Sequence, residues 1–480
     1  MKRELLTSIK AVTLATVGGV VAPNLAYGQE AKSPNIIIIL ADDLGWGDVG
    51  FNGNSVVKTP ALDAMSQQGV EFENFRTVSP LSSPSRASIL TGRNPFRMGI
   101  YAAHTGAVKN GEVTIAEVCK SNGYATGFFG KWHLGWIEAE PYGGDRGYYS
   151  PPQHHGFDEV FATRSAVPTW DPTLTPKGWN QWGSDGSENW SGSRYVHNGV
   201  VETENLSGDD SRIIMDRVIP FIDQAVKEGQ PFMSCVWFHT PHEPVVAGPE
   251  YLKMYEDLGV ESEDQRHYYG CITAMDEQIA RLVAYLKEIG EYENTIITFT
   301  SDNGPADGLT KKGVASAGDF KGHKHQVYEG GIRVPSLMTY PAKIEAGVKV
   351  KSQVITCDYF PTLIDLAGLS FKPYKAYLND GVNVVPTFTN PTMKREESFF
   401  VGWKRIYKGI YGRAVIDGDY KYLYKESATE PELYNITLDP NETTNIIANH
   451  PDIAARMELK MKDMEQSFIY SDQGGDYKSY

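Results

Sequence analysis

The stretch Asn35-Ile36-Ile37-Ile38-Ile39-Leu40-Ala41-Asp42-Asp43 indicates the fold class of this chain. Its unbroken apolar run has no polar face, which is typical of a strand buried on both sides in a parallel sheet. Two aspartates follow at once, so a pair of carboxylates is expected at the carboxyl end of that strand. In open α/β sheets, ligands bind at this edge.

Strand-like and helix-like segments alternate over most of the chain that follows. The expected strands are 35–40, 70–76, 124–129, 232–238, 295–301 and 336–340. The expected helices are 60–68, 85–90, 114–121, 209–227, 263–289 and 358–367. This alternation predicts an α/β fold, with a large and mostly parallel sheet sandwiched by helices.

The pattern changes near Pro391. Short strands at 398–406, 411–416 and 420–425 are separated by Gly-rich or Asp-Gly turns, and a helix is expected at 454–466. Such spacing is typical of an antiparallel meander. We therefore predict a main domain over 29–390 and a smaller α+β subdomain over 391–480.

Residues 1–28 have the features of a secretory signal peptide. Lys2, Arg3 and Lys10 form a positive region, residues 11–22 are apolar, and Ala26-Tyr27-Gly28 is a small-x-small cleavage site. The apolar run is too short to span a bilayer. Cleavage is expected near Gly28-Gln29, which would place the mature protein in the periplasm or outside the cell with no membrane span.

The net charge of the chain and the spacing of its cysteines limit the classes of protein to which it can belong. With 45 Lys and Arg against 60 Asp and Glu, the formal net charge is −15, which argues against nucleic-acid binding. An anionic substrate remains possible if basic side chains gather locally. The four cysteines lie far apart without a C-x-x-C pair, so buried free thiols are expected. An exported location would permit one disulfide.

A second strand end carries more metal-binding chemistry. The expected strand 295–301 is followed by Asp302-Asn303-Gly304, much as the first strand is followed by Asp42 and Asp43. Each pair alone would be an ordinary turn. Together they form an oxygen-only, net-negative set that suits Ca²⁺ or Mg²⁺ better than zinc.

The stretch Ser79–Arg93, SPLSSPSRASILTGR, supplies a nucleophile candidate. Pro84 biases Ser83 toward extended backbone, so Ser82 is expected just before a helix that begins near Ser85. The helix dipole stabilises negative charge there, and the Arg86 guanidinium suits a tetrahedral oxyanion. A plain Ser/Pro helix cap is the alternative.

This run, Ser82-x-Pro84-Ser85-Arg86-x-x-x-Leu90-Thr91-Gly92-Arg93, resembles the signature of the type I (formylglycine-dependent) sulfatases of the alkaline phosphatase superfamily. Its serine form is similar to that of the bacterial exported branch. The resemblance implies that a radical-SAM maturase oxidises Ser82 to formylglycine (3-oxoalanine). One hydroxyl of the hydrated aldehyde would attack sulfur and the other would expel sulfate. The implied ligands of one Ca²⁺ are Asp42, Asp43, Asp302, Asn303 and the modified Ser82.

Three further runs carry the same resemblance. Gly123–His133 matches G-Y-x-T-x-x-x-G-K-W-H, Pro241-His242 lies in a P-H-x-P-like loop, and Lys324 precedes Tyr-Glu-Gly-Gly-Ile-Arg-Val-Pro at 328–335. The alternative for the first run is that Lys131 is an ordinary surface lysine and His133 caps a secondary-structure element. The resemblance, which covers essentially the whole mature chain, implies an alkaline phosphatase-like fold and a sulfatase domain over 29–390.

The resemblance also implies a role for each remaining core residue. Arg86, Lys131 and Lys324 would hold the sulfate oxygens. His242 would protonate the leaving group, since a histidine can exist in both protonation states near neutrality, and His133 would assist sulfate release.

The substrate is expected to be a sulfated glycan or oligosaccharide, with galactose or N-acetylgalactosamine sulfate as the specific guess. A Trp-, Gly- and Asn-rich insertion between Arg164 and Ser207 offers aromatic faces for sugar rings, although its tryptophans could instead fill a small core. The substrate-binding candidates are His104, Trp179, Trp182, His239, His323, His325 and Arg405. Two alternatives stay open: a phosphate or phosphonate ester hydrolase of the same superfamily, and a non-catalytic glycan-binding homologue.

Overall fold

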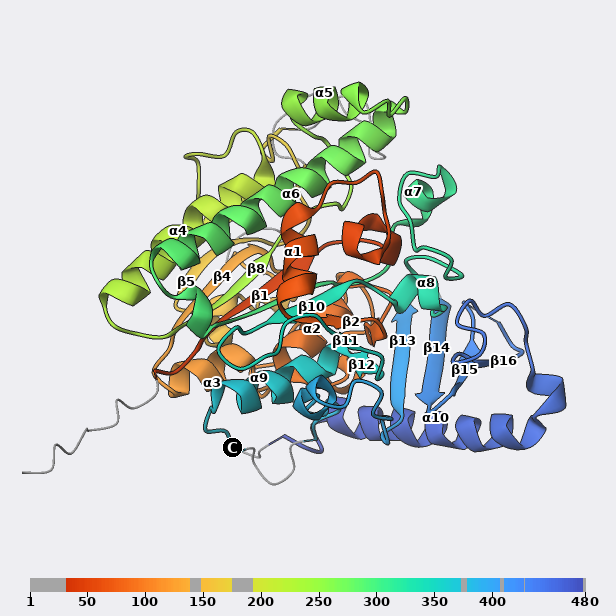
Figure 1. Cartoon of the computed structure of the whole chain (residues 1–480). Coiled ribbons are helices and arrows are strands. Elements are labelled where there is room, and N and C mark those ends of the chain that lie inside the picture. Colours follow the sequence, from red (N-terminus) through yellow and green to blue (C-terminus); the bar gives the residue numbers. More distant parts are fainter. Residues whose placement is uncertain are drawn as a thin grey trace, which may run out of the picture. The chain divides into compact units, whose positions relative to one another are not determined.

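A ten-stranded mixed sheet lies at the centre of the computed structural model, which describes residues 32–138, 148–174, 193–372, 378–405, 410–426 and 428–477 (Figure 1). Its strand order is β11-β2-β10-β9-β1-β8-β4-β5-β6-β7. The strands are β1 Asn35–Ala41, β2 Val70–Phe72, β4 Ala125–Lys131, β5 Glu159–Thr163, β6 Tyr195–His197, β7 Val200–Val201, β8 Phe232–Trp237, β9 Thr295–Ser301, β10 Ser336–Thr339 and β11 Val348–Val350.

The five central strands of this sheet, β9, β1, β8, β4 and β5, run parallel to one another. In register, Ile38 of β1 lies opposite Cys235 of β8 and Thr298 of β9. Antiparallel pairs occur toward the edges, where β10 joins β9 to β2 and where β6 and β7 follow β5. The predicted α/β class is therefore confirmed, with its parallel order concentrated around β1.

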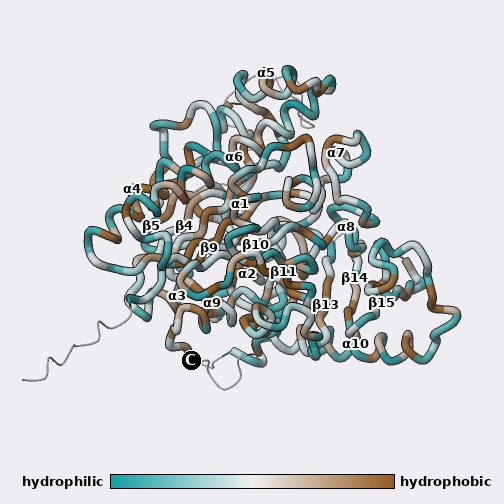
Figure 2. The backbone as a smooth tube through the Cα atoms, viewed as in Figure 1, coloured by the Kyte–Doolittle hydropathy of each residue, from teal (hydrophilic) through white to brown (hydrophobic). Residues whose placement is uncertain are grey.

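The first strand is buried on both faces because the sheet has a helical layer on each side. Ile36, Ile38 and Leu40 join one apolar core, whereas Ile37 and Ile39 join the other, and all five are fully buried. This alternation follows from the two-residue period of a strand. Figure 2 shows apolar residues concentrated on the strands between the two helical layers.

Helices of both layers begin near the predicted positions. One face of the sheet is covered by α1 Pro60–Gln68, α4 Asp210–Lys227 and α6 Glu263–Glu288, with α5 Pro249–Asp257 packed on α6. The other face is covered by α2 Ser82–Thr91, α3 Ile115–Ser121 and α9 Tyr359–Ala367. Short helices α7 Asp307–Lys311 and α8 Glu329–Ile332 lie in the loops that follow β9.

The C-terminal meander forms the predicted antiparallel sheet, of four strands in the order β13-β14-β15-β16. Its strands are β13 Phe399–Arg405, β14 Ile410–Asp417, β15 Tyr420–Tyr424 and β16 Glu432–Asn435. One face packs on the closing helix, α10 Pro451–Asp472, through Phe400, Tyr422 and Met457. The opposite face packs on residues that include Val327 and Ile332.

Several element boundaries differ from the prediction. The expected strand 70–76 is split at Glu73-Asn74 into β2 and β3 Phe75–Arg76, and β3 pairs with β12 Val354–Ile355 instead of the large sheet. The closing helix was predicted at 454–466 but is longer at both ends, since Pro451 is well suited to the first helical turn.

The remaining predictions about the whole chain concern its cysteines, membrane spans and signal peptide. All four cysteines are buried and free, as expected. No helix in the described ranges has both the length and the apolar character needed to cross a membrane. The predicted signal peptide, 1–28, lies outside the described residues.

Candidate active site

Two neighbouring strand ends bring three carboxylates and one amide together. Because β1 and β9 are parallel and Ala41 lies opposite Ser301, Asp42 and Asp302 leave the sheet at the same edge. The Asp43 amide N–H donates to Asp302 Oδ1 at 3.1 Å, and Asn303 Nδ2 donates to Asp43 Oδ1 at 2.7 Å. Asp43 adopts a left-handed φ of 65°, which turns the chain sharply after the strand.

The Ser82 hydroxyl points at this cluster. Its Oγ lies 3.2 Å from Asp42 Oδ1 and 3.3 Å from Asn303 Oδ1. Ser82 is the first residue of α2 and Leu81 is its N-cap, so the helix begins three residues before its predicted start near Ser85. Pro84 is tolerated there because amides in the first helical turn have no intrahelical partner.

Each carboxylate of the cluster has its own cation. Lys131 Nζ lies 2.6 Å from Asp42 Oδ2, and Lys324 Nζ lies 2.6 Å from Asp43 Oδ2. Arg86 Nε donates to Asp302 Oδ2 at 2.9 Å, and its Nη2 lies 2.8 Å from the same oxygen. All three cations that the sequence analysis singled out therefore converge on the Ser82 hydroxyl and its acidic neighbours.

These charges shift one another's protonation equilibria. Burial pushes the pKa of Asp42 upward, but the nearby charges of Lys131, His242 and Arg86 hold it well below the usual range. Burial, together with the negative charge of Asp42, instead raises the pKa of Asp302. One raised pKa among three adjacent carboxylates indicates crowded negative charge, which a divalent cation would relieve.

The donor chemistry fits a hard cation. The four predicted ligands offer carboxylate and amide oxygens, which Ca²⁺ and Mg²⁺ prefer. The structure also brings a histidine to them, because ligand atoms of Asp42, Asp43 and His242 lie within 4.8 Å of one another. The sequence predicted a ligand set of oxygen atoms only, so the His242 ring nitrogen near Asp42 and Asp43 differs from that prediction.

His242 lies in the loop after β8, beside Asp43. Its Nδ1 is 2.6 Å from the Glu243 carbonyl oxygen, so Nδ1–H donates there and Nε2 faces Asp43 Oδ2 at 3.7 Å. The side chain is 23% exposed. Burial lowers the pKa of His242 to about 4, so its ring is neutral at pH 7 before any anion binds.

Two more histidines contact each other close to Lys131. His133, just after β4, and His104, in the loop after α2, both have a left-handed φ of 59°. Their Nε2 atoms are 3.3 Å apart, and Ser83 Oγ donates to the His133 carbonyl oxygen at 2.6 Å. Burial and the Lys131 charge lower the pKa of both rings, that of His104 to about 4.

The candidates near Lys324 divide into two groups. His325 packs edge-on against Trp403, with ring centroids 5.6 Å apart, and the Arg405 guanidinium lies 6.0 Å from the same indole. His323 turns elsewhere, since its Nε2 is 2.9 Å from Asp307 Oδ1 and its Nδ1 is 2.9 Å from the Lys324 carbonyl oxygen. His325 and Arg405 therefore lie at Trp403, next in sequence and in space to Lys324 through His325, whereas His323 pairs with Asp307 of α7.

His239 is not placed to bind substrate. It is fully buried, with Nδ1 2.7 Å from Asp210 Oδ2 and Nε2 2.7 Å from Thr163 Oγ1. Both ring nitrogens are engaged in the core, so the prediction that it contacts substrate was wrong. Trp179 and Trp182, the tryptophan candidates of the insertion, lie outside the described residues.

Some residues that support the site were not predicted. Trp237 lies under Arg86, with the guanidinium carbon 5.2 Å from the ring centroid. Ser83 anchors the loop of His133. The only sequence signal for Trp237 is its place at the end of a strand whose next residues form the histidine loop.

Comparison with known proteins defines the class. A family model described as Sulfatase matches residues 34–369, and one described as N-sulphoglucosamine sulphohydrolase, C-terminal, matches residues 319–467. N-acetylgalactosamine-6-sulfatase of Mus musculus is 30% identical over 406 residues, which cover 81% of this chain and 72% of the relative. The chain belongs to the sulfatase family and is a sulfuric ester hydrolase, as the type I resemblance predicted.

Solved structures confirm the predicted architecture. The structure titled Ps i-CgsB in complex with k-i-k-neocarrahexaose has a TM-score of 0.77 and 28% identity, covering 90% of this chain and 93% of the other. Phosphonate monoester hydrolase of Agrobacterium radiobacter has a TM-score of 0.62 and 21% identity, covering 90% and 96%. The second likeness concerns the fold alone.

Proposed function

We propose that this sulfatase removes O-sulfate from a sulfated glycan or oligosaccharide, with formylglycine made from Ser82 and one bound Ca²⁺. The observation that carries this proposal is the convergence on the Ser82 hydroxyl. Asp42 and Asn303 oxygens lie 3.2 and 3.3 Å from Ser82 Oγ, and the ammonium groups of Lys131 and Lys324 bind the adjoining carboxylates.

The chain's own residues would hold both groups. The oxygens of Asp42, Asp43, Asp302, Asn303 and residue 82 would ligate Ca²⁺, which supplies Lewis acidity toward the sulfate and the attacking hydroxyl. Formylglycine supplies, as its hydrate, the two geminal hydroxyls needed for attack and release. The donor set supports both assignments because it is buried, oxygen-rich and next to Ser82.

Positive side chains would bind the sulfate. Arg86 and Lys131 are buried and Lys324 is partly buried around the position where the ester must approach Ser82. Buried donors that are fixed before substrate arrives stabilise charge that develops in the transition state. Their carboxylate partners keep these cations in place.

The two histidines near the carboxylates would move protons. The His242 Nδ1–H donates to the Glu243 carbonyl oxygen. Its Nε2 is therefore the nitrogen that would protonate the leaving alkoxide. Its lowered pKa does not prevent this, because a bound anionic ester raises the pKa of a neighbouring imidazole. His133, whose Nε2 meets His104, would accept a proton during sulfate release.

The substrate class rests on the relatives. N-acetylgalactosamine-6-sulfatases are similar to this chain, and so is a structure whose title includes a neocarrahexaose. A sulfate ester of galactose or N-acetylgalactosamine agrees with both. His104, His325 and Arg405 would contact the sugar.

Export and maturation complete the proposal. The chain would leave the cytoplasm by its signal peptide, 1–28, after a radical-SAM maturase has oxidised Ser82. Its catalytic domain would extend over 29–390 and its C-terminal subdomain over 391–480.

The decisive experiment measures both the oxidation of Ser82 and the release of sulfate by the same protein. Full-length protein is co-expressed with a radical-SAM maturase, and mass spectrometry of the Ser82 peptide should show loss of two hydrogen atoms. The matured enzyme is then given galactose 6-sulfate, N-acetylgalactosamine 6-sulfate and related sugars, and released sulfate is measured. Full conversion of Ser82 without sulfate release from any sugar would contradict the proposed function.

A phosphate or phosphonate ester hydrolase is the second candidate. His242 beside Asp42 and Asp43 favours it, since nitrogen ligands suit zinc or manganese. Turnover of an aryl sulfate and of its matching aryl phosphate separates the two, and we expect the sulfate to be preferred by at least tenfold in kcat/KM.

A further inference from the structure

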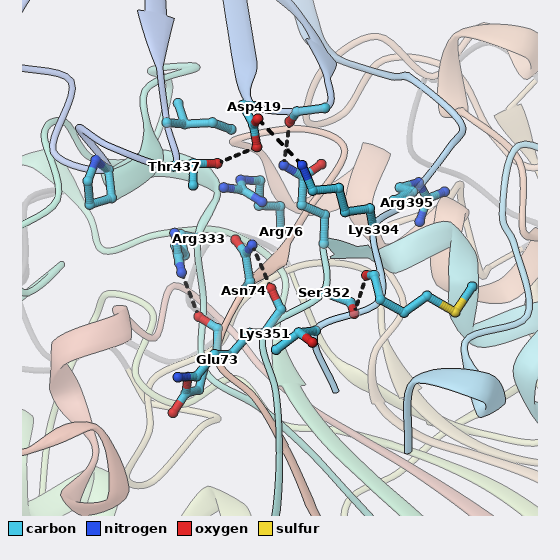
Figure 3. Close-up of a pocket in the computed structure, with 16 residues that line it drawn as sticks. Glu73, Asn74, Arg76, Arg333, Lys351, Ser352, Lys394, Arg395, Asp419 and Thr437 are labelled. Atoms are coloured by element: carbon cyan, nitrogen blue, oxygen red, sulfur yellow. Dashed lines mark hydrogen bonds and ion pairs between the residues drawn. The ribbon is translucent and has the colours of Figure 1, made fainter. Parts of the chain in front are cut away.

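A second charged cavity, of about 430 Å³, opens between the C-terminal sheet and the two-stranded β3–β12 sheet (Figure 3). Its walls come from β3, the segments 351–353 and 392–395, the turn between β14 and β15, and the residues after β16. Five basic side chains line it, against Glu73 and Asp419: these are Arg76, Arg333, Lys351, Lys394 and Arg395. On a chain with a formal net charge of −15, such a local excess of cations needs an explanation.

Two of the arginines that line the cavity, Arg76 and Arg333, belong to a buried ion network. Glu329 receives Arg76 through Nε at 2.9 Å, Arg333 through Nη1 at 3.4 Å and Lys421 through Nζ at 3.1 Å. Lys421 also binds Glu442, at 2.8 Å. Three cations therefore share two carboxylates, which leaves one positive charge in excess.

The excess charge is not fully satisfied within the protein. Arg76 Nη1 and Arg333 Nε are buried, and neither has a hydrogen-bond partner among the residues that the structure describes. Burial lowers the pKa of Arg333 to about 10, so its guanidinium remains charged at neutral pH. Figure 3 shows the Arg76 side chain among those of Arg333, Asn74 and Asp419.

The acidic residues of the cavity already have partners. Asp419 accepts from Thr437 Oγ1 at 2.9 Å and lies 3.8 Å from Lys394 Nζ. The Glu73 carboxylate lies 3.8 Å from Lys349 Nζ, which is outside the cavity lining. Arg395 is compensated by both oxygens of Asp358, at 2.6 and 3.1 Å. The positive charge available to bind an anionic ligand therefore comes from Arg76, Arg333 and Lys351.

The cavity is separate from the Ser82 site. In β13, Trp403 contacts His325 beside the active site, whereas Phe399 pairs with Ile416, next to the turn that lines the cavity. Four residues of a strand span about 13 Å. The cavity and the candidate active site therefore lie near different parts of β13.

We propose that this cavity is a non-catalytic binding site for an oxyanion of the sulfate class. Its ligand is either a sulfate group on a glycan chain whose other sulfate is being removed, or free inorganic sulfate. The choice of sulfate rests on the proposed function. A bound oxyanion would neutralise the surplus charge of the Arg76–Arg333–Lys421 network and receive hydrogen bonds from the basic wall.

Crystals of the full mature protein soaked in selenate provide a direct test. Selenate has the shape and charge of sulfate, and its anomalous signal locates it. We expect one anomalous peak in the cavity, near Arg333 and Lys351, apart from any peak near Ser82. The peak should be lost in K351A/K394A and kept in the control K462A, which removes an exposed lysine of α10 outside the lining.

Kinetics distinguish the two sources of the anion. KM is measured with matured enzyme for a sulfated polysaccharide and for a small aryl sulfate. If the anion belongs to the substrate chain, K351A/K394A raises the ratio of polymer KM to aryl sulfate KM roughly three- to tenfold. A selenate peak with an unchanged ratio assigns the site to free sulfate and still supports the proposal.

Absence of a selenate peak together with an unchanged KM ratio would overturn the proposal. This failure is distinct from failure of the proposed function, in which the wild-type enzyme would release no sulfate from any sugar. Both lysines lie at the cavity rim, so the double substitution is not expected to unfold the protein.

Discussion

At the scale of single residues, the candidate site is a set of buried charges that neutralise one another. Asp42 with Lys131, Asp43 with Lys324 and Asp302 with Arg86 form close pairs. Such pairs are costly to break, because removal of one partner leaves a buried charge uncompensated. The arrangement fixes each side chain before substrate arrives.

Ser82→Ala should abolish sulfate release, by at least about a thousandfold in kcat/KM, because no other hydroxyl contacts both Asp42 and Asn303 among the described residues. Ser88→Ala, six residues later in α2, is the control, since its hydroxyl binds Ser85 and Thr356 instead. Activity of the matured variants is measured by sulfate release. Substantial activity of Ser82→Ala would show that another residue is the nucleophile.

Lys131→Met should reduce kcat by roughly a hundred- to a thousandfold, since it removes a fixed donor near the sulfate. Lys120→Met, which removes an exposed partner of Asp158, is the matched control and should keep nearly full activity. Steady-state kinetics with an aryl sulfate measure the effect. Equal activity of the two variants would argue against sulfate binding by Lys131.

His155 should make stability depend on pH. Its ring stacks on Trp132 and binds Ser150 Oγ through Nε2 at 2.6 Å, and burial lowers its pKa to about 4. An unfolded histidine titrates near 6.5, so between pH 6.5 and 4 the unfolded chain binds more protons than the native protein. Stability therefore falls as pH falls through this range, by roughly 3 kcal/mol for this residue.

Urea unfolding of wild type and His155→Gln at pH 7.5, 5.5 and 4.5 tests this dependence. The wild type should be the more stable protein at pH 7.5, and its advantage should shrink as the pH falls. A constant difference at all three pH values would show that His155 contributes no proton linkage.

At the scale of elements, the contact between the β3–β12 sheet and the C-terminal sheet depends on a buried network. Glu329 at the start of α8 joins Arg76 of β3 to Lys421 of β15. Apolar residues on one face of the C-terminal sheet complete the contact. The loop that carries Lys324 and His325 lies between β9 and α8, so this network also supports the active-site edge.

Lys421→Met should cost roughly 3 to 5 kcal/mol of unfolding free energy, because the buried Glu442 carboxylate would lose the ammonium group that compensates it. Lys460→Met removes a half-exposed partner of Asp417 on the same sheet and should cost less than about 1 kcal/mol. Chemical denaturation measures both values. Similar losses in the two variants would contradict a structural role for the network.

At the scale of the whole molecule, metal binding couples the active site to global stability. The proposed ligands lie at the ends of β1 and β9, in the middle of the large sheet. A cation bound only by the folded protein stabilises it by mass action. Removal of the cation should therefore be measurable far from the site.

Chelation of matured protein should lower Tm, and added Ca²⁺ should restore it, with about 2.7 kcal/mol of stabilisation at a hundredfold excess over Kd. Asp302→Asn should remove most of this Ca²⁺-dependent shift, while the exposed Asp257→Asn should keep it. Scanning calorimetry with and without Ca²⁺ measures the effect. A Tm that does not respond to chelator or Ca²⁺ would contradict the proposed calcium site.

The sequence by itself determined the parallel centre of the sheet and the carboxylates at its edge. A continuous apolar run such as Ile36–Leu40 can be accommodated only between two layers, and side chains that follow parallel strands meet at one edge. The motifs around Ser82, Lys131 and Lys324 were recognisable because each is a local pattern of several specified residues.

Only the tertiary structure decided which isolated residues join the site. His104 and His239 are both single histidines in the sequence, yet His104 meets His133 whereas His239 binds Asp210 and Thr163 in the core. Nothing local distinguishes them, because their surroundings come from segments that are distant in the chain. The cavity at Arg76 and Arg333 has the same origin: its charges belong to separate elements and act together only where the two sheets meet.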